Sequence, residues 1–160
     1  MIDSGVAIAD RIILTGWSYG GYLTLLGLGR QPDLWAGGMA GIAIADWEMN
    51  YEDSADTLRS YQRMLFGGTP AEKREAMRSG SPLAYVDGVR APVLIIQGRN
   101  DTRTPARSIE RYVERLEARG HPVQIDWFDA GHGSADDELS IRHQRRMLSF
   151  VARIGRGNGV

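Results

Sequence analysis

Three residues of this chain have the types, order and settings that nucleophilic catalysis requires. Residues 16–20 read GWSYG, a G-x-S-x-G pattern that follows a short β-branched run and precedes an apolar helical stretch. Small residues on both sides of the serine relieve crowding at such a strand-to-helix turn, which holds the Ser18 hydroxyl at the carboxyl edge of a sheet. The N-terminus of the following helix favours an oxyanion, with the backbone N–H of Tyr19 as the expected first donor. The pattern predicts Ser18 as a nucleophile; the alternative is a plain glycine-rich turn, which matches by chance in roughly 5% of chains of this length.

A serine nucleophile needs a general base, and the base needs an acid to orient it. Asp101 and His132 each follow a run typical of a strand, PVLIIQ at 92–97 and PVQIDWF at 122–128. Both side chains are therefore expected at the same sheet edge as Ser18. Serine, aspartate, histidine is also the chain order typical of sheets of this kind. The sequence predicts a catalytic triad of these three residues.

The other candidates for base and acid fit less well. His121 lies in a turn, and His143 lies among arginines on a helix face that we expect to be solvated. Asp46 also follows a strand, so it stays open as a rival orienting acid or as a residue of the substrate pocket.

Candidate substrate contacts lie close to the predicted strand ends. Trp17 adjoins the nucleophile, and Asp46 and Trp47 follow the second apolar run of the chain. Trp47, Tyr51 and Tyr61 suit an apolar substrate pocket, with ordinary packing as the alternative.

The elements that must position these residues alternate between strand and helix. Strands are predicted at four β-branched or continuously apolar runs, 11–15, 37–45, 92–97 and 122–128. Helices are predicted from their apolar spacing and their end signals at 22–28, from Thr69, from Thr104 to Gly120, and over the last segment. Strands joined by helices of this length imply an α/β fold with a parallel sheet and right-handed crossovers.

Composition excludes several other classes of protein. The chain has 160 residues, enough for one domain, and its 19 basic and 20 acidic residues leave no charge footprint for nucleic acid or an anionic membrane. It has no cysteine, three histidines and no phosphate-binding glycine motif, so we expect no metal and no cofactor. The first residues do not read as a signal peptide and no apolar run is long enough for a membrane span, so a cytoplasmic location is expected.

Several segments resemble the prolyl oligopeptidase family of serine peptidases. The similarity runs through ADRI at 9–12, GWSYGGY at 16–22, FGGTP at 66–70, the segment 81–85, the aspartate loop at 92–105, and GHG at 131–133. The resemblance implies an α/β-hydrolase fold and attack on a peptide or ester carbonyl through an acyl-enzyme. It also implies the triad of Ser18, Asp101 and His132, with Arg103 in contact with the substrate or with a neighbouring domain.

The same resemblance implies features that these residues do not include. Members of the family have further strands before the nucleophile turn and usually an N-terminal β-propeller. We therefore expect residues 1–160 to form a partial hydrolase domain that lacks the usual N-terminal strands and the second oxyanion donor. The edge of the strand Arg11–Gly16 is then open, and pairing with a second copy of the chain is expected to cover it.

The leading hypothesis is a serine peptidase that cleaves peptide bonds. A carboxylesterase or thioesterase on small acyl esters has the same chemistry and stays open as an alternative. A truncated, non-catalytic fragment that acts only with a partner chain is the alternative from a different class.

Overall fold

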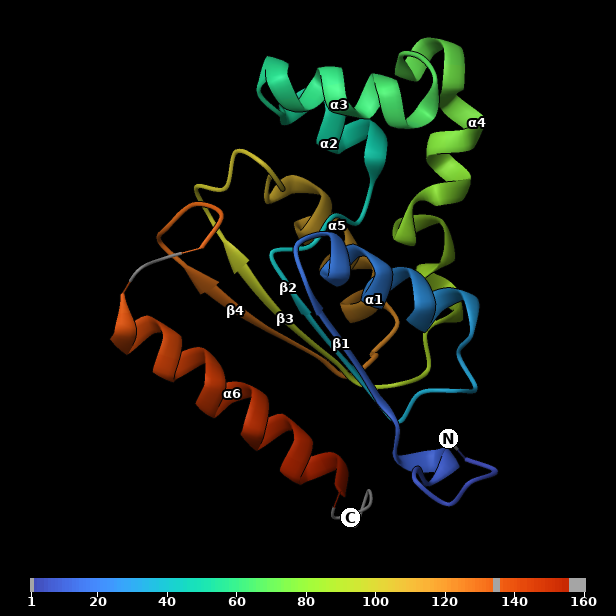
Figure 1. Ribbon diagram of the computed structural model, residues 1–160, viewed down its shortest axis with the longest axis vertical. Helices are drawn as coiled ribbons and strands as arrows, with labels where there is room; N and C mark the ends of the chain where they lie inside the picture. The colour runs from blue at the N-terminus through green and yellow to red at the C-terminus, as the bar shows by residue number, and fades with distance from the viewer. Residues whose placement is uncertain (1, 134–135, 156–160) are drawn as a thin grey trace.

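Four parallel strands form one sheet in the computed structural model, which describes residues 2–133 and 136–155. The strands lie in the order in which the chain forms them, β1 (Ile13–Trp17), β2 (Gly37–Gly41), β3 (Val93–Gly98) and β4 (Val123–Phe128). All carboxyl ends therefore meet at one edge of the sheet (Figure 1). The α/β parallel architecture predicted from the sequence is confirmed.

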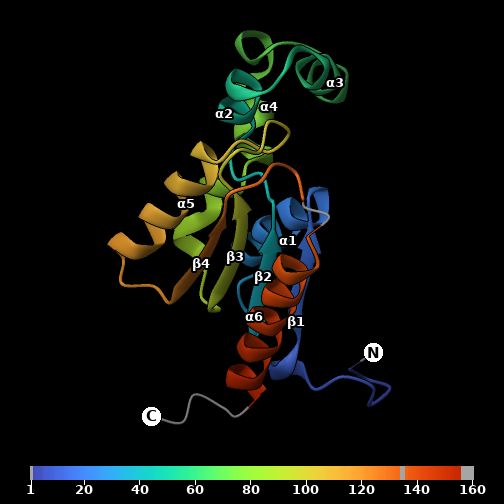
Figure 2. The ribbon, with the colours of Figure 1, turned by 90° about the vertical axis from the view of Figure 1, so that its left-hand side faces the viewer.

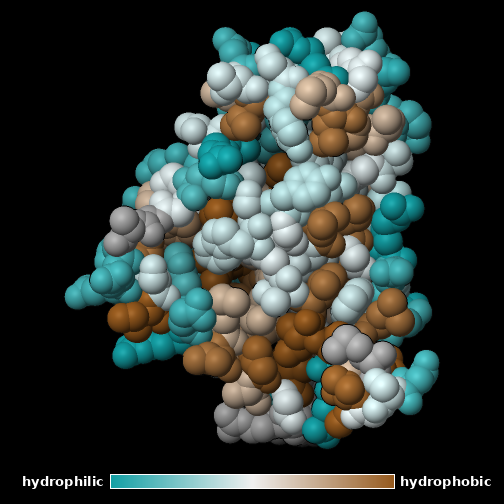
Figure 3. Space-filling model, in the orientation of Figure 1, coloured by the Kyte–Doolittle hydropathy of each residue, from teal (hydrophilic) through white to brown (hydrophobic). Residues whose placement is uncertain are grey.

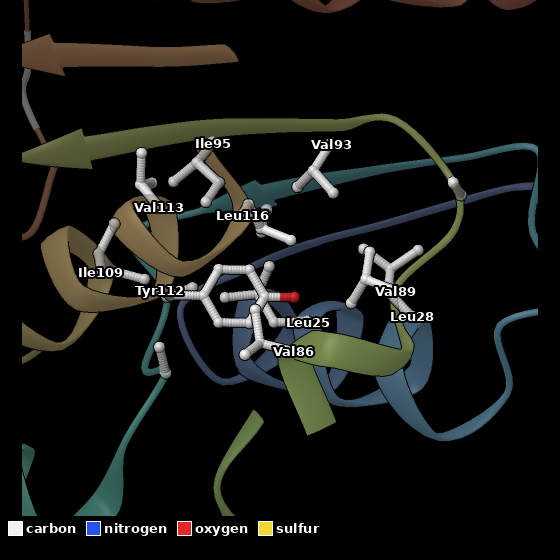
Figure 4. Close-up of a cluster of buried hydrophobic side chains, with 14 residues drawn as sticks. Leu25, Leu28, Val86, Val89, Val93, Ile95, Ile109, Tyr112, Val113 and Leu116 are labelled. Carbon is white, nitrogen blue, oxygen red and sulfur yellow. The ribbon is translucent and has the colours of Figure 1, made fainter. Parts of the chain in front are cut away.

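Helices cover both faces of this sheet. On one face α1 (Tyr19–Arg30), the 3-10 segment η2 (Pro82–Gly88) and α5 (Arg107–Ala118) surround the larger core cluster, in which Leu25 and Tyr112 pack on Val93 and Ile95 (Figure 4). On the other face α6 (Asp137–Gly155) packs Phe150 against Leu94 and Ile96. The continuous apolar character of β3 follows from this burial on both faces.

Three further helices lie beyond the carboxyl ends of the strands (Figures 1 and 2). They are α2 (Trp47–Asp53), α3 (Asp56–Phe66) and α4 (Pro70–Gly80). The predicted start of α4 is confirmed, because Thr69 and Glu72 form a capping box and Pro70 is the first helical residue. A short 3-10 turn, η1 (Ala9–Arg11), precedes β1.

All four predicted strands differ from the observed ones in their bounds, two of them by a single residue at one or both ends and two by more. The first begins two residues later than expected, and the run 37–45 leaves the sheet after Gly41, where Ile42 adopts a positive φ of 38°. Residues 42–45 stay buried although they are not in a strand. The apolar pattern of the sequence could not show where the strand ends, because the residues in the strand and those after it are equally buried.

The outer edge of β1 has no strand partner among the described residues. Apolar surface is visible between α6 and β1 on the face shown in Figure 3. Pairing of this edge with a second copy of the chain stays a prediction. None of the described helices is long and apolar enough to cross a membrane.

Gly41 at the end of β2 provides a test of how closely the sheet packs beside Ser18. A Cβ added at Gly41 would lie 1.7 Å from the ring of Trp17. We expect Gly41→Ala to lower the free energy of unfolding, measured in urea, by about 2–3 kcal/mol, because the ring must move. Gly20→Ala is the matched control, since a Cβ there meets no atom within 4 Å. It should leave stability unchanged or raise it by up to about 1 kcal/mol; equal losses in the two variants would contradict this packing.

Candidate active site

The turn between β1 and α1 presents Ser18 in a strained backbone conformation. Ser18 has φ 57° and ψ −118°, which a non-glycine residue adopts only where its surroundings impose it. Its backbone N–H donates to the carbonyl of Gly41 at 2.8 Å. A Cβ at Gly16 would lie 2.3 Å from the backbone of Gly20, so the first glycine of the G-x-S-x-G pattern is required by crowding across the turn.

Ser18, His132 and Asp101 form a continuous chain of hydrogen bonds. The distance from Ser18 Oγ to His132 Nε2 is 2.8 Å, and that from His132 Nδ1 to Asp101 Oδ2 is also 2.8 Å. An ionised Asp101 can only accept, which assigns the proton to Nδ1 and leaves Nε2 to accept from the serine hydroxyl. The structure therefore places the three predicted residues in the arrangement of a nucleophile, a base and an orienting acid.

Asp101 is held by its own loop. The side chain is buried and its Oδ1 accepts from the backbone N–H groups of Arg103 at 2.8 Å and Thr104 at 2.9 Å. Thr104 Oγ1 donates to the other oxygen, Oδ2, at 2.7 Å. These bonds fix the carboxylate that faces His132. The sequence predicts a helix from Thr104, but α5 begins only at Arg107.

We expect Thr104→Val to reduce kcat about three- to tenfold, since Asp101 loses a charge-assisted hydrogen bond while the shape of the side chain is kept. Thr102→Val is the control, because Thr102 is exposed in the same loop. Steady-state kinetics on both variants measure the effect. Equal kcat values for Thr104→Val and wild type would show that the hydroxyl does not help to hold the carboxylate.

Tyr19 is the first residue of α1, and the first N–H groups of a helix have no intrahelical partner. Its position directly after Ser18 suits the predicted oxyanion donor, which stays a prediction. The Tyr19 ring lies 5.1 Å from the ring of Tyr22 and 6.4 Å from that of Trp47.

A cavity of about 390 Å³ opens above Ser18 and His132. The far wall comes from α2 and α3, which provide Trp47, Leu58 and Tyr61. Arg103 also lines the cavity. The arrangement places an apolar pocket with one cationic side chain beside the serine hydroxyl.

Two predicted substrate contacts do not reach this cavity. The Trp17 ring instead lies against Gly41 and 6.0 Å from the ring of His143. Asp46 caps α2 by accepting from the backbone N–H of Met49 at 2.8 Å, which also removes it as a rival orienting acid. Trp47 and Arg103 do line the cavity, and contact of any of these four residues with substrate stays a prediction.

Tyr51 does not line the cavity either, and its hydroxyl accepts from Arg63 at 3.3 Å. His143 is a further correction, because it is buried rather than solvated, with 8% of its surface exposed. Burial lowers the pKa of the His143 imidazole below its ordinary value. Within residues 2–133 and 136–155, no group of three or more histidine, aspartate or glutamate side chains could hold a metal ion.

Comparison with protein families gives one match that covers nearly the whole chain. The model of the prolyl oligopeptidase family matches residues 1–156. Dipeptidyl aminopeptidase BIII of Pseudoxanthomonas mexicana is 32% identical, over 95% of this chain and 23% of the relative. Dipeptidyl peptidase family member 6 of Caenorhabditis elegans is 28% identical, over 94% of this chain and 21% of the relative. The chain thus spans less than a quarter of the length of these curated relatives.

Solved structures agree with this match. A puromycin-hydrolyzing peptidase of Mycobacterium tuberculosis superposes with a TM-score of 0.88 at 28% identity, over 96% of this chain and 23% of that one. The acylaminoacyl peptidase of Pyrococcus horikoshii gives a TM-score of 0.81 at 29% identity, over 95% of this chain and 26% of that one. The four strands and their helices correspond to part of an α/β-hydrolase peptidase domain.

Proposed function

Since this chain belongs to the prolyl oligopeptidase family, we propose that it carries the nucleophile, base and orienting acid of a serine peptidase. The observation that carries the proposal is the pair of 2.8 Å hydrogen bonds that joins Ser18, His132 and Asp101 at the floor of a cavity. Nothing in this constellation needs a metal or a cofactor for acyl transfer.

The geometry supports a two-step reaction. Ser18 Oγ attacks the carbonyl carbon and passes its proton to His132 Nε2, while the Asp101 carboxylate stabilises the imidazolium without taking a proton. The Tyr19 N–H donates to the oxyanion of the tetrahedral intermediate. Collapse breaks the C–N bond, His132 returns the proton to the departing amine, and an acyl ester remains on Ser18. Water then attacks this ester with His132 again as base, and the proton returns to Ser18 Oγ.

The cavity supports a peptide or acyl substrate with an apolar side chain next to the scissile carbonyl. Trp47, Leu58 and Tyr61 provide apolar contacts, and the Arg103 guanidinium offers hydrogen bonds to a carbonyl or carboxylate further along the substrate. The relatives named above are peptidases, which supports an amide as the scissile bond. The cytoplasmic location stays a prediction.

Comparing a peptide p-nitroanilide with a p-nitrophenyl ester of the same acyl group tests the proposal. We expect turnover of both, with kcat/KM about tenfold or more higher for a benzyl than for a methyl side chain, because the apolar pocket gains contact area. Turnover of the ester without detectable turnover of the amide would instead support the carboxylesterase alternative. Failure to turn over either substrate, with Ser18 still reactive toward a fluorophosphonate, would support the fragment that requires a partner chain.

A further inference from the structure

Three aromatic rings form a contact on the α6 side of the sheet, which we name the aromatic bridge and define as Trp17, His143 and Phe128. The ring of His143 lies 4.9 Å from that of Phe128 and 6.0 Å from that of Trp17. Trp17 ends β1 and Phe128 ends β4, the two opposite edges of the sheet. His143 of α6 therefore connects strand ends that the sheet itself keeps apart.

Glycines in the two middle strands allow the outer rings to reach inward. A Cβ at Gly41 of β2 would overlap the Trp17 ring, at 1.7 Å. A Cβ at Gly98 of β3 would meet the backbone carbonyls of residues 130–131, at 2.6 and 2.5 Å, and would lie 3.2 Å from the Phe128 ring. Gly41 therefore leaves the space that the Trp17 ring occupies, and Gly98 leaves space for the loop backbone and for the edge of the Phe128 ring.

Each outer ring is connected to one reacting residue. Trp17 directly precedes Ser18, whose N–H is anchored on Gly41 under the same ring. Phe128 begins the loop that leads to His132, and its carbonyl accepts from the backbone N–H of Arg99 at 2.9 Å. A displacement of either ring is thus passed to Ser18 or to His132 through a few covalent bonds.

The surroundings of His143 favour the neutral imidazole. It is buried, its Nε2 has no hydrogen-bond partner among the described residues, and burial lowers its pKa. The charged groups that act on it are Asp126 of β4, which favours protonation, and Arg142 of α6, which opposes it. Asp126 itself pairs with Arg142 at 3.3 Å and with Arg146 at 3.6 Å.

The described residues that line the cavity beside His143 are uncharged. A cavity of about 230 Å³ adjoins its ring, and the other residues around this cavity are Trp17, Phe128, Gly133, Leu139 and Ser140. The anion that acts on the ring, Asp126, is already paired with two arginines. A protonated ring would therefore lack an unpaired counter-ion in the bridge and would gain free energy by leaving it.

We propose that His143 is a positioning residue, whose neutral ring between Trp17 and Phe128 holds the strand ends that carry Ser18 and His132 at hydrogen-bonding distance. Acid that protonates His143 displaces the ring and separates the pair. Activity then depends on two histidines, His132 as the base and His143 through alignment. This inference rests on the proposed serine-peptidase function for its kinetic part only.

The test follows the rate constant for fluorophosphonate labelling of Ser18 between pH 5 and 8 in the full chain. One ionising base gives a rate that falls about tenfold per pH unit on the acid side, and a second required histidine makes the fall steeper. In wild type we expect the labelling rate to fall more than tenfold per pH unit. In His143→Phe, which keeps an aromatic ring that cannot be protonated, we expect it to fall about tenfold per pH unit. His121→Phe is the matched control, because His121 is bound to the carbonyl of Ala91 and lies outside the bridge, and it should keep the wild-type profile.

His143→Ala removes the bridge and should lower the labelling rate at pH 8 roughly ten- to a hundredfold, with His143→Phe restoring it. The proton NMR signal of His132 Nδ1–H, moved downfield by its bond to Asp101, reports the alignment without any turnover. We expect it to weaken in His143→Ala and to persist to lower pH in His143→Phe than in wild type.

The proposal would be overturned if both His143 variants kept the wild-type pH profile of the labelling rate and the wild-type NMR signal of His132 Nδ1–H. Absence of labelling in wild type, together with the expected NMR changes, would instead reject the peptidase function and keep the positioning role.

Discussion

Replacing His132 by alanine is expected to lower kcat by about 10⁶-fold, an effect as large as that of removing the Ser18 hydroxyl itself. The reason is that Ser18 Oγ and His132 Nε2 lie 2.8 Å apart, and without the imidazole the hydroxyl has no acceptor for its proton. Steady-state hydrolysis of a peptide p-nitroanilide measures the loss. Circular dichroism should show an unchanged fold, because His132 lies in a loop rather than in the core.

His121→Ala is the matched control for this variant. His121 is also a loop histidine, and its Nε2 lies 2.9 Å from the carbonyl of Ala91. Its replacement should leave kcat within about twofold of wild type, a difference of less than 0.5 kcal/mol in the barrier. Comparable losses in the two variants would contradict the assignment of His132 as the base.

Replacing Asp101 by asparagine should lower kcat by about 10⁴-fold with little effect on KM. Asparagine matches the carboxylate in shape, but its amide can turn an N–H toward His132 and favour the wrong tautomer. It also leaves the imidazolium of the transition state without a negative charge. The N–H groups of Arg103 and Thr104 that now bind Oδ1 would lose a charged acceptor, so a stability loss of about 1–3 kcal/mol is expected too.

Asp46→Asn is the matched control for Asp101→Asn. Asp46 caps α2 through Met49, and asparagine is an equally good N-cap residue, so neither stability nor kcat should change. A loss of activity in Asp46→Asn that matched the loss in Asp101→Asn would revive Asp46 as the orienting acid.

The sequence predicted which residues lie together better than it predicted the ends of the elements. Ser18, Asp101 and His132 could be expected at one place because each follows a strand, and parallel strands bring their carboxyl ends together whatever the exact bounds are. The run 37–45 could not be divided correctly, because residues 42–45 are as deeply buried outside the sheet as residues 37–41 are within it.

The environments of residues that contact distant parts of the chain were harder to predict from the sequence. Thr104 was read as a helix start because Pro105 follows it, although its hydroxyl serves Asp101. His143 was assigned to a solvated face because of its arginine neighbours. It in fact lies four residues before Met147 and seven before Phe150, which is the spacing of one helix face, and this could have placed it on the buried side.

The sequence also placed only some of the expected cavity residues correctly. Trp47 was expected near the substrate and does line the cavity, whereas Trp17, next to the nucleophile in sequence, turns to the other side of β1. Successive residues along a strand alternate between the two faces, so adjacency to Ser18 did not place the Trp17 ring at the site.

Mapping the covalent adduct of a fluorophosphonate by mass spectrometry identifies the nucleophile without any assumption about the substrate. We expect a single stoichiometric adduct on the serine of the peptide that contains residues 16–20, formed by folded wild type and absent in Ser18→Ala. We also expect His132→Ala to react at a small fraction of the wild-type rate. An adduct on another residue, or labelling that persists in Ser18→Ala, would contradict the assignment of Ser18 as the nucleophile.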